Sequence, residues 1–284
     1  MAGGVLYVVA TPIGNLEDVT LRALRVLREV DVVAAEDTRR TRGLLVHHGI
    51  DTPLVSYHDA VERTRAPRLV EQMLAGRTVA LVSDAGTPGI ADPGYHLVRA
   101  AVAAGIPVVP IPGPSAVAAL VSVAGVPSER FAFEGFLPNR SAARRERLRA
   151  LAGETRAMVF LEAPTRLAAC LADLEAELGD REAVLGRELT KLHEECVRGP
   201  VSALRRHVAA MDPVRGECVL LVTGAADAGP PAAIDVDARI RRLRAEGLGT
   251  REIAARLAHE TGRTRRECYQ RVLALGDPGR SRDG

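Results

Sequence analysis

The chain has 284 residues, of which 47% are hydrophobic and 26% charged, proportions that are ordinary for a globular protein of about two domains. Its formal net charge of +2 excludes a strong global field for nucleic acid, so any basic surface must be local. No apolar run is long enough to span a bilayer, the N-terminus lacks the basic segment of a signal peptide, and the four cysteines are scattered without a C-x-x-C pair. We therefore expect a cytoplasmic protein without a metal site.

Apolar runs alternate with helical patterns over residues 1–125. Helices separate the strands expected at residues 5–10, 31–35, 53–57, 78–82 and 106–111. Asn15 or Asp18 is expected to cap the first helix. The alternation predicts an α/β fold, with a mainly parallel sheet covered by helices on both faces.

The loop at residues 83–94 is the stretch around which the chain is organised. It contains three glycines, two prolines and two aspartates directly after a buried strand. An ordinary strand-to-helix connection, which is the alternative interpretation, needs only about two to six residues. Ligands of open α/β sheets bind beyond the carboxyl ends of strands, and glycine lets the backbone approach them closely. The loop is therefore predicted to bind a ligand.

Two other strand ends carry polar residues. Glu36 and Asp37 stand where dinucleotide folds have the acid that binds ribose hydroxyls, although they could instead cap the next helix. The lack of a G-x-G-x-x-G motif disfavours an NAD site. Residues 112–115, Pro-Gly-Pro-Ser, offer N–H groups and a hydroxyl at a helix N-terminus, which suits a carboxylate or another polar group of a ligand.

A second α/β domain is expected at residues 126–226. Its strands are predicted at 131–136, 157–161, 183–186 and 216–222. Two α/β domains favour a site in the cleft between them. Arginines between residues 140 and 149 form a basic helix or loop, for which a solvated helix face is the alternative.

Residues 227–284 are expected to form a linker and a helix-turn-helix-like tail. Alanine, glycine and proline dominate residues 225–231, and Gly262 is expected to make a turn between two short helices. Residues 239–271 contain ten arginines but only four glutamates. That local excess is what binding to a phosphate backbone requires, whereas a helical cap with arginine-rich faces is the alternative.

Seven stretches, in order along the chain, resemble the tetrapyrrole-methylase-like (class III) methyltransferases, and among them those that act on small-subunit ribosomal RNA: residues 10–16, 35–39, 83–88, 92–94, 112–115, 134–138 and 187–191. The resemblance runs from Val5 to Gly224 and continues into the tail. It implies two α/β domains of the tetrapyrrole methylase type with a cleft between them, plus the small helical tail. It also implies a homodimer, S-adenosylmethionine in the cleft, and 2′-O-methylation of a cytidine in the decoding region of 16S rRNA, as free RNA or within the small ribosomal subunit.

The chain departs from the family at five positions. Gly89 and Ala91 stand where the family usually has an aliphatic residue and then Ser or Asn, and Leu161, Ala163 and Thr165 stand where it has Tyr, Ser and His. Within residues 161–166, these departures leave Glu162 and Arg166 as the candidate functional residues.

The resemblance also implies site residues. Cofactor contacts are expected from Pro12, Gly14, Asp84, Ala85, Gly86, Thr87, Pro88, Ile90, Ser115, Ala116 and Glu162. Methyl transfer to a hydroxyl needs a proton acceptor but no metal, and the candidates are Glu36, Asp37, Asp84, Asp92, Glu188 and Lys191. Contacts with RNA are expected from Arg39, Arg40, His58, Arg144, Arg145, Arg166, Arg251, Arg265 and Arg266.

Lys191 is the only lysine of the chain, every other basic side chain outside histidine being arginine. It could be a surface charge left by chance or a point charge for a substrate phosphate. It could also act on the ribose hydroxyl, as a base with a lowered pKa or as a hydrogen-bond donor, and this third role is the one we predict.

Two other functions remain open at this point. A porphyrinoid C-methyltransferase would share the fold and the cofactor but should lack an arginine-rich tail. A non-enzymatic nucleic-acid-binding regulator would use the tail alone and would not need the 83–94 loop.

Overall fold

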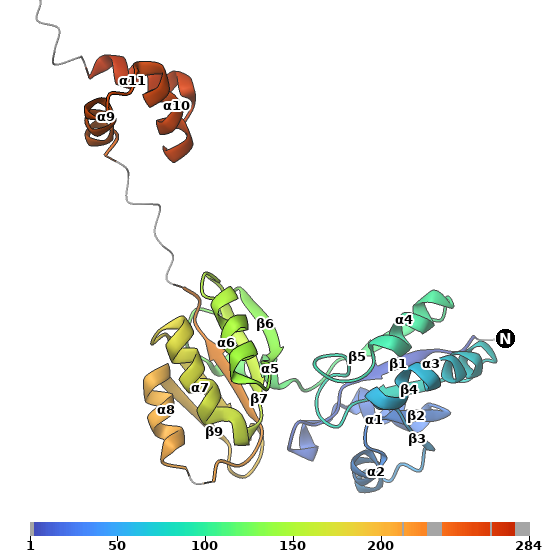
Figure 1. Ribbon diagram of the computed structural model, residues 1–284. Helices are drawn as coiled ribbons and strands as arrows, with labels where there is room; N and C mark the ends of the chain where they lie inside the picture. Colours follow the sequence, from blue (N-terminus) through green and yellow to red (C-terminus); the bar gives the residue numbers. More distant parts are fainter. Residues whose placement is uncertain (1–2, 212, 226–234, 262, 276–284) are drawn as a thin grey trace, which may run out of the picture. The chain divides into compact units, whose positions relative to one another are not determined.

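The computed structural model describes residues 3–211, 213–225, 235–261 and 263–275 (Figure 1). The chain divides into two compact units, Met1–Ala225 and Ala226–Gly284. The first contains two β-sheets, and the described residues of the second form three helices. Apart from Ala225, the linker expected at residues 225–231 lies outside the described residues, as does the turn expected at Gly262.

The first sheet is parallel throughout. Its strand order is β3 (Leu54–Ser56), β2 (Val32–Ala35), β4 (Val79–Val82), β1 (Leu6–Val9) and β5 (Val108–Ile111). Two helices pack on each face: α3 (Asp59–Leu74) and α4 (Tyr95–Ala103) on one, α1 (Leu21–Glu29) and α2 (Thr38–His47) on the other. The continuous apolar runs of the strands follow from burial on both faces. The predicted parallel sheet with helices on both faces is confirmed.

Helix starts in this sheet differ partly from the prediction. Thr20, and neither Asn15 nor Asp18, caps α1, because its hydroxyl accepts the N–H of Ala23 at 3.1 Å. Asn15 instead caps a short 3₁₀ turn. Asp37 caps α2 by accepting the N–H of Arg39 at 2.8 Å.

The second sheet is mixed. Its order is β6 (Phe131–Phe136), β7 (Ala157–Glu162), β10 (Cys218–Val222), β8 (Glu182–Arg187) and β9 (Glu195–Pro200). Only the β6–β7 pair is parallel. The edge strand β9 was not expected, because its sequence, ECVRGP, has neither an apolar run nor a clear alternation.

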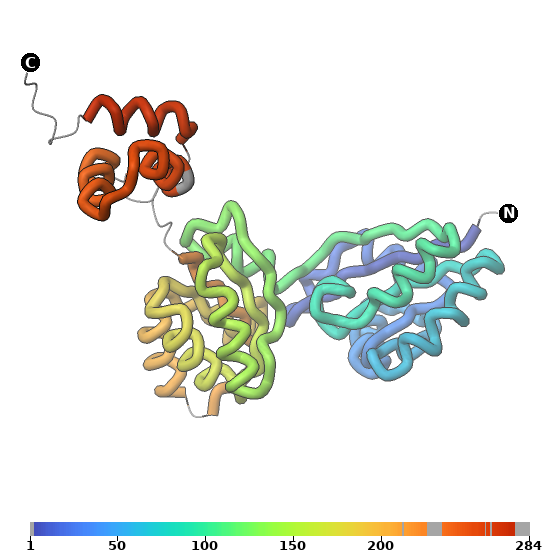
Figure 2. The backbone as a smooth tube through the Cα atoms, turned by 45° about the horizontal axis from the view of Figure 1, so that its top comes forward, coloured from blue at the N-terminus to red at the C-terminus, as the bar shows by residue number. Residues whose placement is uncertain are grey.

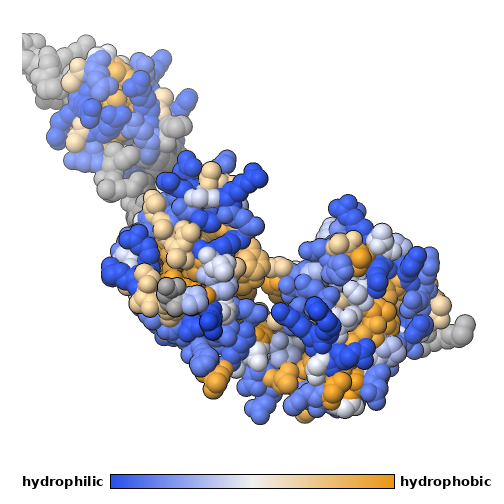
Figure 3. All heavy atoms as spheres, turned by 60° about the horizontal axis from the view of Figure 1, so that its bottom comes forward, coloured by the Kyte–Doolittle hydropathy of each residue, from blue (hydrophilic) through white to orange (hydrophobic). Residues whose placement is uncertain are grey.

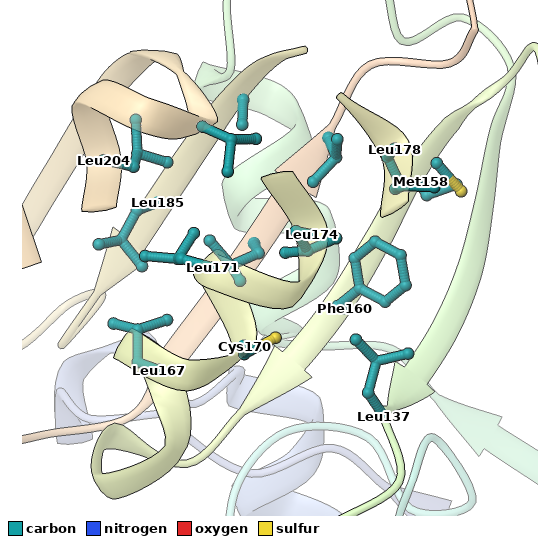
Figure 4. Packing of buried hydrophobic residues seen from close by; sticks show 14 of the residues in the cluster. Leu137, Met158, Phe160, Leu167, Cys170, Leu171, Leu174, Leu178, Leu185 and Leu204 are labelled. Atoms are coloured by element: carbon teal, nitrogen blue, oxygen red, sulfur yellow. The ribbon is translucent and has the colours of Figure 1, made fainter. Parts of the chain in front are cut away.

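Helices α6 (Ser141–Ala150), α7 (Pro164–Leu178) and α8 (Val201–Ala209) cover one face of the second sheet. In Figure 4, Leu174 of α7 lies beside Phe160 of β7, and Leu171 of the same helix lies toward Leu185 of β8. Helix α5 (Ala116–Val123) packs on the opposite face, where Leu120 and Ile13 share a cluster with residues of β7, β8 and β10. We refer to residues 3–115 as the first lobe and to residues 116–225 as the second lobe.

The C-terminal unit is a bundle of α9 (Val236–Ala245), α10 (Thr250–Thr261) and α11 (Arg265–Ala274) (Figure 2). Its core contains Ile240, Leu243, Ile253 and Leu257. The predicted capping box of α11 is confirmed, since the side chains of Thr264 and Glu267 each accept the other residue's backbone N–H. Hydrophilic residues dominate the visible surface of this unit (Figure 3). In the described part of the chain, no helix is both long and apolar enough to cross a bilayer.

Candidate functional site

A cavity of about 380 Å³ is lined by residues of both lobes. The first lobe contributes the ends of β2 and β4 with the loops that follow them, and the second lobe contributes the start of α5, the end of β7 and the start of β10. The predicted cofactor contacts that line it are Asp84, Ala85, Gly86, Thr87, Ile90, Ser115, Ala116 and Glu162. Pro12, Gly14 and Pro88 are not among the lining residues, whereas Ile13, between two of them, is.

Residues 83–94 are joined to the first turn of the chain. Thr11 and Gly86 exchange two backbone hydrogen bonds, of 2.9 and 3.0 Å. Gly86 has φ +84°, while a Cβ added there would meet only Ile13 at 3.5 Å and the Pro114 carbonyl at 3.7 Å. Glycine is therefore required by the backbone conformation and not by lack of space. Ala91 has φ +62°, a strained value of the kind that clusters in ligand-binding loops.

Three carboxyl groups, from Glu36, Asp84 and Asp92, line the cavity on the first-lobe side. Burial, followed by the negative charge of Glu36, raises the pKa of Asp92 to about 6. Burial also raises the pKa of Glu36, although a backbone hydrogen bond from Asp84 opposes the shift. Carboxyl groups with raised pKa values in a cavity are suited to exchange protons near neutral pH.

Asp37 has a different role from its neighbour Glu36. Its carboxylate accepts hydrogen bonds from the side chain and the backbone of Arg39, which lower its pKa to about 2. It does not line the cavity. Such a carboxylate is a weak proton acceptor, and the arrangement supports the alternative interpretation, in which Asp37 caps α2. Its partner Arg39 is exposed.

Arg40 and Asp84 are paired at the wall of the cavity. Asp84 accepts the backbone N–H of Asp37 at 2.9 Å, and its other oxygen lies 3.5 Å from the Arg40 guanidinium. The Arg40 side chain remains 65% exposed. Part of its hydrogen-bonding capacity is thus available to a ligand.

Lys191 lies in a strained loop that contacts the first lobe. Its ammonium is 2.8 Å from Glu188 and 3.3 Å from Glu217, and Glu188 and Thr190 have positive φ values of 51° and 67°. A Cβ on Gly14 would lie 2.4 Å from Cγ of Lys191, so this close packing requires glycine. Of these residues only Glu217 lines the cavity.

The pKa of Lys191 moves against one of its expected roles. Burial lowers this pKa, but hydrogen bonds to Glu188 and Glu217 outweigh burial and raise it above its ordinary value. The lowered pKa that a base requires is therefore not found, because two carboxylates stabilise the ammonium. The same contact lowers the pKa of Glu188, which makes that carboxylate a weaker proton acceptor.

The arginines expected to bind RNA from the second lobe are engaged in ion pairs. Arg144 has a side chain only 4% exposed and lies 2.6 Å from Asp173, which counts against direct contact with RNA. Arg145 pairs with Glu177. Arg166 donates to the buried Glu162 at 3.0 Å and to the Leu137 carbonyl at 2.8 Å, so it fixes one wall of the cavity.

The remaining predicted RNA contacts are at least partly accessible. His58, at the start of α3, is half-buried, and Arg251, Arg265 and Arg266 are exposed on the C-terminal bundle. Other arginines of the bundle have structural partners, because Arg239 pairs with Glu260 and Arg271 with Asp237. The arginine excess of the bundle therefore serves partly to hold its helices together.

The sequence did not reveal most of the second-lobe wall. The residues missed are Val117, Phe136, Leu161, Ala163, Pro164, Glu217, Cys218 and Val219. The start of β10 adjoins the end of β7 because the two strands are antiparallel, with Cys218 opposite Glu162. Only knowledge of this pairing brings Glu217, Cys218 and Val219 to the cavity.

Comparisons with known proteins agree with this architecture. The profile of the family described as "Tetrapyrrole (Corrin/Porphyrin) Methylases" matches residues 5–205. The chain is 49% identical to "Ribosomal RNA small subunit methyltransferase I" of Pseudomonas aeruginosa, over 96% of this chain and 98% of that one. It is 50% identical to the protein of the same name from Xylella fastidiosa, over 94% and 98% of the two chains.

Solved structures are similar at lower identity. The methyltransferase CobJ is 23% identical, with a TM-score of 0.59 over 78% of this chain and 95% of that one. A uroporphyrin-III C-methyltransferase from Thermus thermophilus, complexed with S-adenosylhomocysteine, is 22% identical, with a TM-score of 0.54 over 78% and 97%. At these identities the likeness supports a common fold.

Proposed function

The chain belongs to the tetrapyrrole (corrin/porphyrin) methylases and, among them, to the ribosomal RNA small subunit methyltransferase I family, and we propose that it methylates the ribose 2′-hydroxyl of a cytidine in the decoding region of 16S rRNA, with S-adenosylmethionine as the methyl donor. Relatives of that name match at 44–50% identity over nearly their whole length, which supports the reaction class. In this structure the supporting observation is one cavity that combines acidic groups, a helix N-terminus and apolar walls.

The lining residues fit this donor. The sulfonium and ammonium of S-adenosylmethionine favour the acidic side formed by Glu36, Asp84 and Asp92, and its carboxylate favours the N–H groups at the start of α5. Ile13, Leu161 and Val219 supply apolar surface for the uncharged part. Bound there, the cofactor supplies an electrophilic methyl group.

Asp92 is the proton acceptor in this proposal, with Glu36 as the neighbour that tunes it. The hydroxyl must lose its proton as it attacks, and a carboxylate with a pKa near 6 is both ionised at neutral pH and basic enough to take the proton. Glu36 contributes a nearby negative charge that favours proton uptake by Asp92.

Lys191 acts through its neighbours. Its ammonium holds Glu217, which lines the cavity, and Glu188, which accepts the backbone N–H of Glu217 at 3.0 Å. Its stem packs against Gly14 of the first lobe. We assign Lys191 as a positioning residue that holds the cavity walls of the two lobes in their relative positions.

A homodimer is part of the proposal, and an apolar stripe on β6 supports it. Phe131, Phe133 and Phe136 are 40%, 38% and 55% exposed, although the chain has only four phenylalanines. A bulge between Phe133 and Gly135 keeps all three opposite Ala157, Val159 and Leu161, on one face of the sheet. Light scattering should give the mass of two chains for the wild type and of one chain after Phe131→Ser with Phe133→Ser; a monomeric wild type contradicts the proposal.

RNA binding by the C-terminal bundle completes the proposal. Arg251, Arg265 and Arg266 are exposed there and carry charge suited to phosphates. A cytoplasmic location, expected from the sequence, is consistent with this substrate.

Methyl transfer from labelled S-adenosylmethionine to small ribosomal subunits, to free 16S rRNA and to a corrinoid precursor tests the function. We expect label in RNA, and mass spectrometry should locate it on the 2′-oxygen of one cytidine. Label in the corrinoid alone would instead support a porphyrinoid C-methyltransferase. A protein that binds RNA but not S-adenosylmethionine would support a non-enzymatic regulator.

A further inference from the structure

A second cavity, of about 430 Å³, adjoins the first in the first lobe. Arg40 and Asp84 line both cavities, so their ion pair forms a shared wall. The second cavity is lined on one side by Pro12 and Leu16 and on the other by α2.

Helix α2 presents one continuous face to this cavity. The lining residues of the helix include Arg40, Gly43, Leu44 and His47, which are spaced three, four and seven residues from the first. That spacing puts them on one side of a helix. A cationic group thus stands at the end nearer the first cavity, and an imidazole at the other.

Neither packing nor backbone conformation in the described residues requires glycine at position 43. In the described residues it is the only glycine inside an α-helix, and a Cβ added to it would meet no atom within 4 Å. Its φ is not in the left-handed region. Glycine in a helix interior destabilises the helix relative to alanine. Position 43 has room for a side chain but lacks one, and the close approach of a ligand to the backbone would explain this.

Arg40 is the second, independent feature. Its guanidinium lies 3.5 Å from Asp84, a loose ion pair, and the side chain is 65% exposed. A planar guanidinium with free N–H groups is suited to a phosphate oxygen. Its position on the shared wall places such a phosphate between the two cavities.

We propose that the second cavity binds the nucleotide adjacent to the methylated one, with the sugar–phosphate backbone lying against α2 at Gly43 and the intervening phosphate bound by Arg40. This inference rests on the proposed function, because it takes the target ribose to enter the first cavity. RNA is then held in an extended form across the wall, and the absence of a side chain at position 43 provides the room.

Gly43→Ala and Gly43→Leu test the proposal, because both residues favour helix and should leave the fold intact or more stable. Val46→Ala is the matched control, since Val46 is on the same helix, is 67% exposed and does not line the cavity. Each variant is assayed as the full chain for its thermal midpoint, for S-adenosylmethionine affinity by calorimetry, and for kcat and KM with small ribosomal subunits or 16S rRNA, whichever the wild type methylates.

We expect Gly43→Ala to raise KM for the RNA substrate about fivefold and Gly43→Leu at least about 20-fold, with kcat, cofactor affinity and thermal midpoint preserved. Arg40→Gln should raise the same KM. Unchanged KM in both glycine variants, with the wild type active, overturns the inference while the proposed function stands. A loss of cofactor affinity in Gly43→Ala assigns the cavity to the cofactor and also overturns it. A wild type that methylates no RNA removes the basis of both.

Discussion

The two lobes contribute unlike walls to the same cavity. The first lobe provides three acids and a glycine loop from the ends of parallel strands. The second provides mainly backbone and apolar groups, with Glu217 and a buried Glu162 that is paired with Arg166. All strands of a parallel sheet end at the same edge, so polar residues that follow them gather there. In the mixed sheet, starts and ends of strands share an edge, as Cys218 and Glu162 do. We therefore expect the chemical step to depend on side chains of the first lobe, and the positioning of the cavity walls to depend on side chains of the second lobe.

The largest expected effect is that of Asp92→Asn. If Asp92 accepts the proton, turnover should fall by about 10²-fold or more, the usual scale for a positioned acid–base group, with little change in RNA affinity. Glu217→Gln, an acid of the second lobe that also lines the cavity, should cost less than about tenfold. Kinetics under saturating cofactor measure both. Equal losses of turnover in the two variants would contradict this division of roles between the lobes.

Lys191 tests the positioning role of the second lobe. Lys191→Ala removes the contacts with Glu188 and Glu217, and we expect cofactor affinity and turnover to fall about tenfold together. Lys191→Arg keeps the charge and should restore part of both. The pH profile of turnover should keep its midpoint in either variant. A shifted midpoint would mean that Lys191 itself exchanges the proton.

Gly86→Ala tests the loop of the first lobe. Because φ is +84°, an added Cβ strains the backbone by about 1–2 kcal/mol, although it fits sterically. Cofactor affinity, measured by calorimetry, should fall about tenfold. Gly153→Ala is the control, since Gly153 has an ordinary φ and open space. Unchanged affinity in Gly86→Ala would show that the loop conformation does not govern binding.

The C-terminal bundle should act on RNA alone. Replacing Arg251, Arg265 and Arg266 with glutamine should leave cofactor affinity unchanged and weaken RNA binding several-fold at low salt. The slope of log affinity against log salt should become shallower by about two to three, one phosphate contact per arginine. Titrations at several salt concentrations measure this slope. An unaltered slope would support the alternative of a structural cap.

The smallest effect concerns stability. The pKa of Asp92 is raised from 3.8 to about 6 in the folded chain, so between these values the folded state holds a proton that the unfolded state has lost. Wild-type stability therefore declines as pH rises through this window. Asp92→Asn should be more stable than the wild type by about 2 °C above pH 6, after allowance for partial exposure, and should match it below about pH 4. Thermal scans against pH show whether this difference appears.

The sequence predicted the first lobe better than the second, because in the parallel sheet the residues of the site directly follow apolar strands. Continuous apolar strands such as β4, followed by Asp84 and Gly86, are a local signal, and both residues do line the cavity. The edge strand β9 has no such signal, and the pairing of β10 with β7 joins residues about 60 positions apart. The engagement of Arg144 by Asp173 depends on how α6 packs on α7, which no local pattern encodes.

Single-turnover methyl transfer to the RNA substrate between pH 5 and pH 9 tests the central claim most directly. The account predicts label on a ribose 2′-oxygen, at a rate that rises with pH through a midpoint no higher than about 6 and is then constant. Asp92 must be ionised to accept the proton, and the positive charges of the bound cofactor favour its ionised form. In Asp92→Asn the rate should be low and lose this midpoint. The same midpoint in Asp92→Asn, or methylation at a site other than ribose, would contradict the account.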